Sequence, residues 1–218
     1  MPNNHIITIQ CITELANLID TITQSYDKHD ILVVFDIDDT LITIPRNSHD
    51  YTAYLNKYNV SHHEVYDLCD RIPQARIDYI CGIRKVPCQP ETHQTLSHIV
   101  NNYHVTALTS RCHSLHHATY NDLADSAMHI IESNPFYKLH NDYHDIDNKY
   151  AYHRNTISIS GQNKGTILKY FIDKHGHDYK MIILIDDTRS KLVDFINAFI
   201  NTDIAIKGIH YVKYNDKQ

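Results

Sequence analysis

Four short polar segments of this 218-residue chain carry side chains that bind metal ions or phosphate. Each lies at the end of a predicted strand or helix: Asp36-Ile37-Asp38-Asp39-Thr40, Thr109-Ser110-Arg111, Lys164 and Asp186-Asp187. If the acids converge, their like charges need a counter-charge, and one lysine supplies too little. A hard divalent cation meets that need, and Mg²⁺ is the usual choice when phosphate completes its coordination. Lys164 opens a predicted helix whose dipole attracts anions, so lysine and dipole both favour a bound phosphate.

The hydrophobic pattern predicts an α/β fold with a parallel sheet flanked by helices. Residues 31–36 and 181–186 are continuous apolar runs that end in an acid, as in parallel strands buried on both faces. Further strands are expected at 104–109, 156–160 and 204–214, helices at 7–26, 90–102, 113–133, 163–174 and 190–201, and a loop at 134–152. In such sheets ligands bind beyond the carboxyl ends of the strands, where the polar segments lie.

Residues 49–84 differ from the rest of the chain because they are polar, rich in Tyr and His, and helix-like only in patches. We predict a small, mainly helical cap at 46–87, inserted after the first strand into a Rossmann-like core formed by residues 1–45 and 88–218. The tyrosines of this insertion suit either substrate contact or packing inside the cap, since Tyr combines an apolar ring with a hydrogen-bonding hydroxyl. They are Tyr51, Tyr54, Tyr58, Tyr66 and Tyr79.

Composition excludes several classes of protein. Lys and Arg total 20 against 26 Asp and Glu, so the net charge of −6 lacks the basic excess of a general nucleic-acid binder. Neither GxxxxGK[ST] nor GxGxxG occurs. No stretch approaches the roughly 18 apolar residues of a membrane span, and the N-terminus does not resemble a secretory signal. Five cysteines without a CxxC pair predict free thiols in the reducing cytoplasm, although a non-classical export signal would not be visible in the sequence.

The stretch VVFDIDDT at residues 33–40 resembles the DxDxT signature of the haloacid dehalogenase-like superfamily. Thr109 corresponds to the second motif of that superfamily, Lys164 to the third and Asp186-Asp187 to the fourth, in the expected order. The resemblance covers roughly residues 30–45 and 88–214, and the insertion lies where the superfamily places a type-1 cap. VVFDIDDTLI together with ALTSR also resembles a bacterial branch that includes effectors of intracellular pathogens, which implies export into a host cell.

The resemblance implies a Mg²⁺-dependent phosphomonoester hydrolase with an aspartyl-phosphate intermediate. Asp36 would be the nucleophile, and Asp38 would protonate the leaving oxygen and then activate the hydrolytic water. Mg²⁺ would be held by Asp36, by the backbone carbonyl of Asp38 and by an acid of the Asp186-Asp187 pair. Between these two acids we favour Asp187 as the direct ligand.

The resemblance also implies the groups that hold phosphate. Thr109 and the backbone of Ser110 would bind phosphate oxygens, and Lys164 would neutralise charge on the nucleophile and the phosphoryl group. Arg111 is expected to reach a substrate phosphate through two parallel hydrogen bonds. A surface salt bridge is the alternative role for this arginine.

The sequence leaves the substrate class and two alternative functions open. The implied partner is a phosphorylated small molecule or a phosphoprotein, including phosphotyrosine, and neither nucleic acid nor a membrane is expected. The cap is expected to set substrate choice while the core sets the chemistry. The alternatives are a catalytically weak module that binds a phosphorylated ligand, and phosphotransfer to an acceptor other than water.

Three histidines, His113, His116 and His117, follow the second motif closely. The pairs His113–His116 and His113–His117 have spacings that can ligate a metal on a helix. No HExxH motif accompanies them, so the sequence favours an exposed helical face over a metal site.

Overall fold

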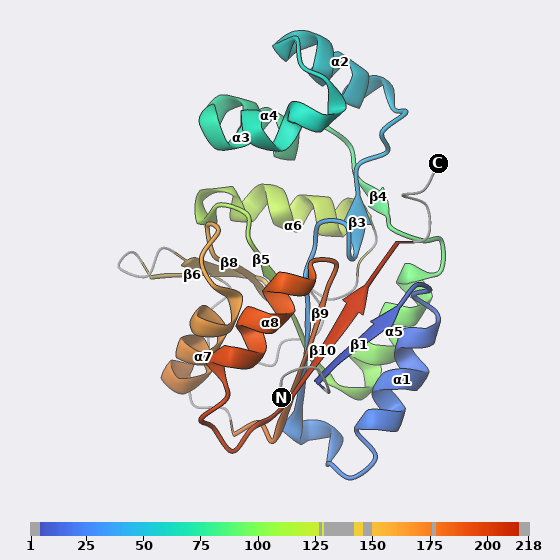
Figure 1. The fold of residues 1–218 in the computed structure, drawn as a ribbon, viewed down its shortest axis with the longest axis vertical. Coiled ribbons are helices and arrows are strands. Elements are labelled where there is room, and N and C mark those ends of the chain that lie inside the picture. Colours follow the sequence, from blue (N-terminus) through green and yellow to red (C-terminus); the bar gives the residue numbers. More distant parts are fainter. Residues whose placement is uncertain (1–4, 127, 129–141, 146–149, 176–177, 214–218) are drawn as a thin grey trace.

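A mixed eight-stranded sheet forms the centre of the molecule (Figure 1). The computed structural model describes residues 5–126, 128, 142–145, 150–175 and 178–213. The strand order is β1-β10-β9-β2-β5-β8-β7-β6, in which the first six strands run parallel and β7 and β6 continue the sheet antiparallel. The strands are β1 (Ile6–Ile9), β2 (Ile31–Phe35), β5 (His104–Thr109), β6 (Asp142–Asp145), β7 (Tyr150–His153), β8 (Thr156–Ser158), β9 (Met181–Asp186) and β10 (Ala205–Tyr211). The predicted α/β class with a mostly parallel sheet is therefore confirmed.

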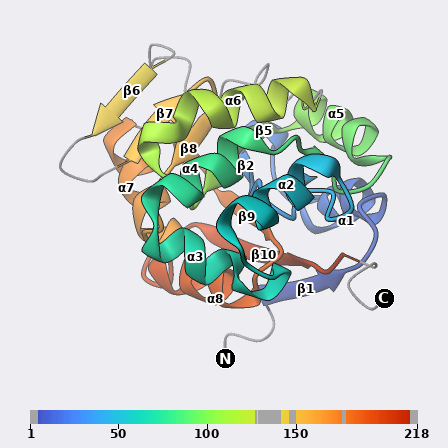
Figure 2. The same cartoon turned by 90° about the horizontal axis from the view of Figure 1, so that it is seen from above.

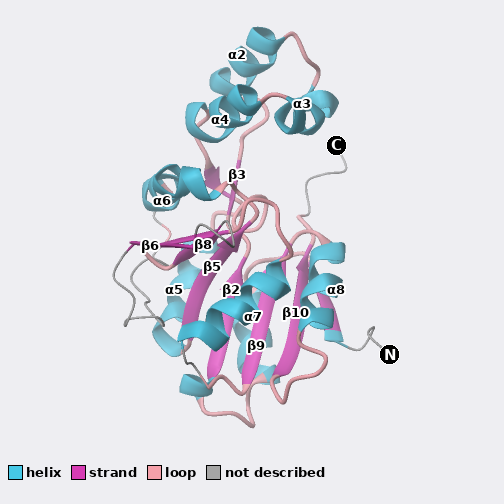
Figure 3. Cartoon of the chain, turned by 90° about the vertical axis from the view of Figure 1, so that its left-hand side faces the viewer, coloured by secondary structure: helices cyan, strands magenta, loops and turns pink. Residues whose placement is uncertain are grey.

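Helices cover both faces of this sheet (Figure 3). Helices α1 and α5 pack on one face, and α7 and α8 on the other. The helices outside the cap are α1 (Glu14–Ile22), α5 (Thr92–Asn102), α6 (His116–Asp125), α7 (Lys164–His175) and α8 (Arg189–Ala198). No helix in the described part of the chain has both the length and the apolar character needed to cross a bilayer.

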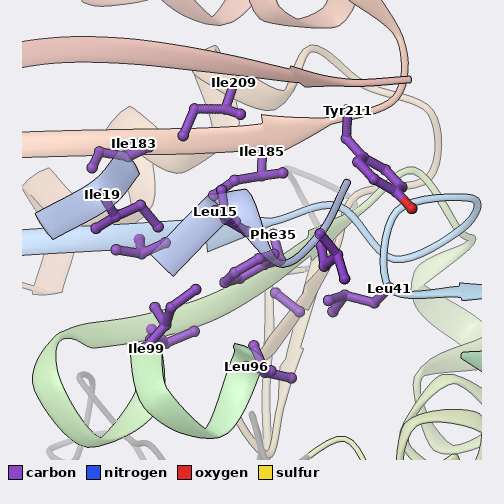
Figure 4. Packing of buried hydrophobic residues seen from close by; sticks show 14 of the residues in the cluster. Leu15, Ile19, Phe35, Leu41, Leu96, Ile99, Ile183, Ile185, Ile209 and Tyr211 are labelled. Carbon is purple, nitrogen blue, oxygen red and sulfur yellow. The ribbon is translucent and has the colours of Figure 1, made fainter. Parts of the chain in front are cut away.

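Strand β2 shows how the sequence produces two cores. All five of its residues are buried, and alternate side chains point to opposite faces of the sheet. Val33 and Phe35 join the cluster under α1 and α5, whereas Leu32 and Val34 join the cluster under α7 and α8. Figure 4 shows part of the first cluster, with Phe35 among the side chains of α1 and α5. The continuous apolar run thus reflects burial on both faces.

A small helical cap lies beyond the carboxyl ends of the strands (Figures 1 and 2). Two short antiparallel strands, β3 (Ile42–Thr43) and β4 (Val86–Pro87), form the stem through which the chain enters and leaves it. The cap helices are α2 (His49–Tyr58), α3 (Val65–Arg71) and α4 (Pro73–Gly82). Tyr51 and Tyr54 are buried in a hydrophobic cluster that belongs to the cap itself. The side chain of Tyr66 lies outside the described residues.

The predicted helix at 7–26 is wrong at its start. Residues 6–9 form strand β1, which pairs in parallel with β10 at the edge of the sheet, and the helix occupies only Glu14–Ile22. Pairing with β10 gives these four residues backbone hydrogen bonds across the sheet, and this tertiary contact overrides the local helical spacing. The predicted helix at 113–133 is likewise shorter, because α6 ends at Asp125, and most residues after it lie outside the described part.

The predicted loop at 134–152 contains two strands. Part of it lies outside the described residues, but 142–145 and 150–153 form the antiparallel pair β6 and β7. Tyr150 and Tyr152 are fully buried and pack against Phe171 of α7. Tyrosine rings supply the buried surface of β7, so the polar composition of this segment did not indicate a core strand.

Candidate functional site

Three adjacent strands bring the predicted motifs to one edge of the sheet. Strand β2 lies between β9 and β5, and Asp36 follows β2 directly, while Thr109 ends β5 and Asp186 ends β9. The backbone N–H of Asp36 donates to the carbonyl oxygen of Ile185 at 2.9 Å, which extends the β2–β9 ladder by one residue. The ladder register therefore fixes Asp36 beside the end of β9.

Lys164 connects the acids of the first and fourth motifs. Its Nζ donates to Oδ1 of Asp36 at 2.5 Å and to Oδ2 of Asp186 at 2.6 Å. All three residues are buried, and Lys164 is only 2% exposed. Burial alone would lower the pKa of Lys164, but the charges of Asp36 and Asp186 hold that pKa above its ordinary value. The two acids therefore favour the charged form of the buried lysine.

A glycine next to Lys164 determines where helix α7 lies. A Cβ atom on Gly165 would lie 2.6 Å from Cβ of Ala198 and 2.8 Å from Cα of Phe195 in α8. Only glycine therefore permits this close approach of the two helices. Because Lys164 is the first residue of α7, the same packing positions its ammonium group over the ends of β2 and β9.

The donor set fits a hard divalent cation. Asp36, Asp186 and Asp187 each present a carboxylate oxygen, and these oxygens lie within 4.8 Å of one another. Three acids face the single charge of Lys164, so the cluster carries an excess of negative charge that Mg²⁺ would neutralise. Burial, opposed by Lys164 and reinforced by Asp186, raises the pKa of Asp36 to about 7. Burial together with the charge of Asp186 raises the pKa of Asp187 to about 6.

Asp186 and Asp187 have different surroundings. Both oxygens of Asp186 already accept hydrogen bonds, Oδ1 from the backbone N–H of Thr188 at 2.9 Å and Oδ2 from Lys164. Asp187 is half-buried, and Oδ1 of its carboxylate accepts from the Thr188 hydroxyl at 3.2 Å. The Thr40 hydroxyl accepts from the backbone N–H of Asp187 at 3.1 Å, and it donates to Oδ2 of Asp36 at 3.4 Å. The threonine of the first motif thus connects Asp36 to the fourth motif.

Asp38 points to a different partner. Arg111 donates from Nε to Oδ2 of Asp38 at 2.9 Å and from Nη2 to Oδ1 at 2.7 Å. The third nitrogen of the guanidinium group, Nη1, donates to Oδ2 of Asp122 at 2.6 Å, and Lys85 contacts the same carboxylate at 3.3 Å. Partial desolvation of the carboxylate would raise the pKa of Asp38, but the charge and hydrogen bonds of Arg111, together with the charges of Lys85 and Lys164, outweigh this effect and hold the pKa below its usual range.

This arrangement differs from the expectation for Arg111. Its side chain is 3% exposed, whereas that of Asp38 is 53% exposed, so the arginine lies beneath the acid. In this structure its guanidinium group holds Asp38 and Asp122 in place. Neither Asp122 nor Lys85 stands in a sequence motif, and tertiary packing alone brings Asp122 to Arg111 and Lys85 to Asp122.

The second motif is held by the loop that follows β8. Thr109 is buried, and its hydroxyl accepts from the backbone N–H of Arg111 at 3.2 Å. The carbonyl of Ser110 accepts from the N–H of Gly161 at 2.9 Å. Gly161 has a φ of 76°, which glycine adopts without strain. These contacts fix the backbone of the predicted phosphate-binding segment.

A pocket of about 320 Å³ lies between the core and the cap. Its core side includes Asp38, Ser110 and Arg111, and its cap side includes Arg46, Tyr51, His62, Arg76 and Tyr79. The volume is within the range of small-molecule sites. Of the four cap tyrosines whose side chains are described, two line the pocket: Tyr51, which belongs to the cap's hydrophobic cluster, and Tyr79, which packs against it.

Comparison with known proteins gives one match. A family model described as a protein of unknown function, DUF2608, matches residues 8–218. No curated protein and no solved structure matches the chain. The matched range includes both core segments, the cap and every residue of the site described above, and the chain therefore belongs to the DUF2608 family.

Proposed function

We propose that this chain is a Mg²⁺-dependent phosphomonoester hydrolase of the haloacid dehalogenase-like type. The observation that carries the proposal is the buried Lys164, which bridges Asp36 and Asp186 while a carboxylate oxygen of Asp187 lies within 4.8 Å of theirs. A lysine that only stabilised the fold would need one acid, whereas three acids around it leave an unbalanced charge. A cation and a phosphate account for both the excess acid and the buried lysine.

Asp36 forms the covalent intermediate in this proposal. A carboxylate oxygen of Asp36 bonds to phosphorus while the ester P–O bond breaks, and the leaving oxygen takes a proton from Asp38. Asp38 then removes a proton from water, the water oxygen bonds to phosphorus, and the bond to Asp36 breaks to release inorganic phosphate. Division into two displacements replaces one difficult step by two easier ones.

Other groups of the site hold charge and position. Asp36, Asp187 and the backbone of Asp38 would hold Mg²⁺, which when bound shields the nucleophile from the negative phosphate. Lys164 stabilises the charge that develops on the phosphoryl oxygens, and Thr109 with the Ser110 backbone binds those oxygens. Asp186 orients Lys164.

The pocket supports a substrate larger than phosphate alone. Arg46, Arg76 and two tyrosine rings on the cap side provide contacts for a polar or aromatic leaving group. The substrate class is therefore a phosphomonoester whose leaving group fills this pocket, either a small molecule or a phosphorylated side chain such as phosphotyrosine. Remote contacts of this kind alter substrate preference without altering the chemistry.

Turnover of p-nitrophenyl phosphate tests the proposal directly. We expect hydrolysis with Mg²⁺, loss of activity on chelation, recovery on adding Mg²⁺, and little support from Ca²⁺, which prefers a larger and looser shell. Asp187→Ala should raise the Mg²⁺ concentration needed for half-maximal rate by at least about 10-fold. The exposed acid Asp203 provides the control, and Asp203→Ala should leave this concentration unchanged. If Asp186→Ala raises the Mg²⁺ requirement and Asp187→Ala does not, Asp186 is the direct ligand.

Asp38→Asn is expected to act selectively on substrates with poor leaving groups. The loss should be roughly 10²–10⁴-fold for alkyl phosphates, the usual contribution of a positioned general acid, and smaller for aryl phosphates that need little protonation. The slope of log(kcat/KM) against leaving-group pKa measures this difference. Asp39→Asn is the matched control, because Asp39 instead accepts from the Thr43 hydroxyl at 2.6 Å. Equal losses across the series would remove the acid role from Asp38.

One observation favours a second function, a module that binds a phosphorylated ligand and turns it over weakly. Both oxygens of Asp38 accept from Arg111, an arrangement that suits a fixed carboxylate better than an acid carrying a proton. Such a module would bind phosphate esters in the presence of Mg²⁺ with no release of inorganic phosphate. The p-nitrophenyl phosphate assay separates the two functions.

A further inference from the structure

Three histidine side chains meet where helix α6 begins beside strand β7. His116 and His117 are the first two residues of α6, and His153 is the last residue of β7. Each ring offers a nitrogen, and the three nitrogens lie within 4.8 Å of one another. The ring centroids are 4.1 Å apart for His116 and His117, 4.6 Å for His117 and His153, and 5.1 Å for His116 and His153. The fold thus adds a third histidine that no sequence spacing could indicate.

Hydrogen bonding presets the orientation of one ring. Nδ1 of His116 lies 2.8 Å from the backbone carbonyl oxygen of His113. Because a carbonyl only accepts, Nδ1 carries the proton and the lone pair of the neutral ring is on Nε2. Histidines that bind metals commonly donate their other N–H to a carbonyl or carboxylate in this way, which fixes the tautomer.

The other two rings differ in exposure. His153 is 4% exposed, and its ring packs edge-on against Tyr120, with centroids 5.4 Å apart. His117 is exposed on the first turn of α6. The cluster therefore combines one fixed buried ring, one hydrogen-bonded ring and one ring that is open to solvent.

We propose that His116, His117 and His153 form a binding site for a divalent transition-metal ion, with Zn²⁺ as the best match. Imidazole nitrogen suits Zn²⁺, Cu²⁺ and Ni²⁺, in contrast to the carboxylates of the first site, which suit Mg²⁺. Three histidines and a water molecule complete a tetrahedral zinc site, and the exposure of His117 lets water reach the fourth position. Zn–N bonds of about 2.0–2.1 Å place the nitrogens about 3.3 Å apart, so the three nitrogens, which already lie within 4.8 Å of one another, need only a small approach.

The ion would join β7 to the first turn of α6. The same helix carries Thr119 and Asp122, both of which accept hydrogen bonds from Arg111. Metal binding would therefore restrain the helix that holds Arg111, at a place separate from the carboxylate cluster. The proposal does not depend on the hydrolase function, because it concerns different ligands and a different ion.

Titration with Co²⁺ in excess Mg²⁺ tests the site in the full chain. Mg²⁺ occupies the carboxylates, and Co²⁺ bound by three histidines in a tetrahedral site gives intense visible absorption that Zn²⁺ removes by displacement. We expect one equivalent of such Co²⁺ in the wild-type protein. His117→Ala, an exposed substitution, should weaken binding by more than the roughly 10–100-fold that loss of an outer-shell partner costs. His113→Ala is the control, because the backbone carbonyl that orients His116 is kept.

A second measurement distinguishes loss of the metal site from misfolding of a variant. Zn²⁺ should raise the Tm of the wild-type and His113→Ala proteins but not that of His117→Ala, whose fold is checked by circular dichroism. His116→Ala should behave like His117→Ala. The proposal is overturned if Co²⁺ shows only the weak absorption of six-coordinate oxygen ligation, or if both histidine variants bind Co²⁺ as tightly as the wild type. Either result would mean that the three rings only pack against one another.

Discussion

Replacement of Asp36 by asparagine is expected to lower kcat on p-nitrophenyl phosphate by on the order of 10⁴–10⁶-fold. Losses of this size are typical when a residue essential to covalent catalysis is removed. An amide oxygen of Asn cannot serve as the nucleophile, although the side chain keeps the shape of Asp. The fold should be retained, because Lys164 still has Asp186 as a partner and one of three like charges is removed. In the absence of Mg²⁺, the Tm of the variant should equal or exceed that of the wild type.

The opposite end of β2 supplies the control for this variant. Asp30 directly precedes the strand, and Asp30→Asn should leave both kcat and KM unchanged. Beryllium fluoride, which mimics an aspartyl-phosphate, should inhibit the wild-type protein, and in a direct binding measurement it should bind to the wild type and not to Asp36→Asn. Retention of more than a few per cent of activity by a folded Asp36→Asn protein would contradict the covalent mechanism.

The parts of the site that the sequence predicted are those fixed by strand ends. Val33 and Phe35 face one core and Leu32 and Val34 the other, so β2 reads as an unbroken apolar run that ends at Asp36. Strand β9 reads in the same way. Because parallel strands end at the same edge of a sheet, the positions of these two apolar runs in the sequence predict that their terminal acids lie at one edge.

The parts that escaped prediction depend on contacts between distant segments. Arg111 and Asp38 are 73 positions apart, and their two hydrogen bonds follow from the path of the loop after β5. His153 reaches α6 only because β7 folds back along β8, in a region whose composition suggested a loop. The local hydrophobic pattern of the sequence does not indicate these contacts, because each depends on how whole helices and strands pack against one another.

Electrostatics explains why the same residues serve both stability and the proposed chemistry. Lys164 and Asp186 are 2% and 1% exposed at their side chains, so neither charge is compensated by water. Loss of one partner of a buried pair typically costs about 3–5 kcal/mol, because the remaining charge stays buried without a counter-charge. An exposed pair such as Lys169 and Asp173 on the same helix contributes about 0.3–0.5 kcal/mol.

Lys164→Met should therefore lower the free energy of unfolding by about 3–5 kcal/mol in the absence of metal, and it should also abolish turnover. Urea denaturation in the presence of a chelator measures the first effect, with Lys169→Met as a matched lysine replacement on the same helix.

The double variant Lys164→Met, Asp186→Asn removes the uncompensated charge on Asp186, so it should recover much of the lost stability without recovering activity. If the double variant is no more stable than Lys164→Met, the loss arises from packing of the lysine stem and not from uncompensated charge. If Lys164→Met is as stable as Lys169→Met, the acids of the cluster are not held by this lysine, and the charge argument for a cation at the site fails with it.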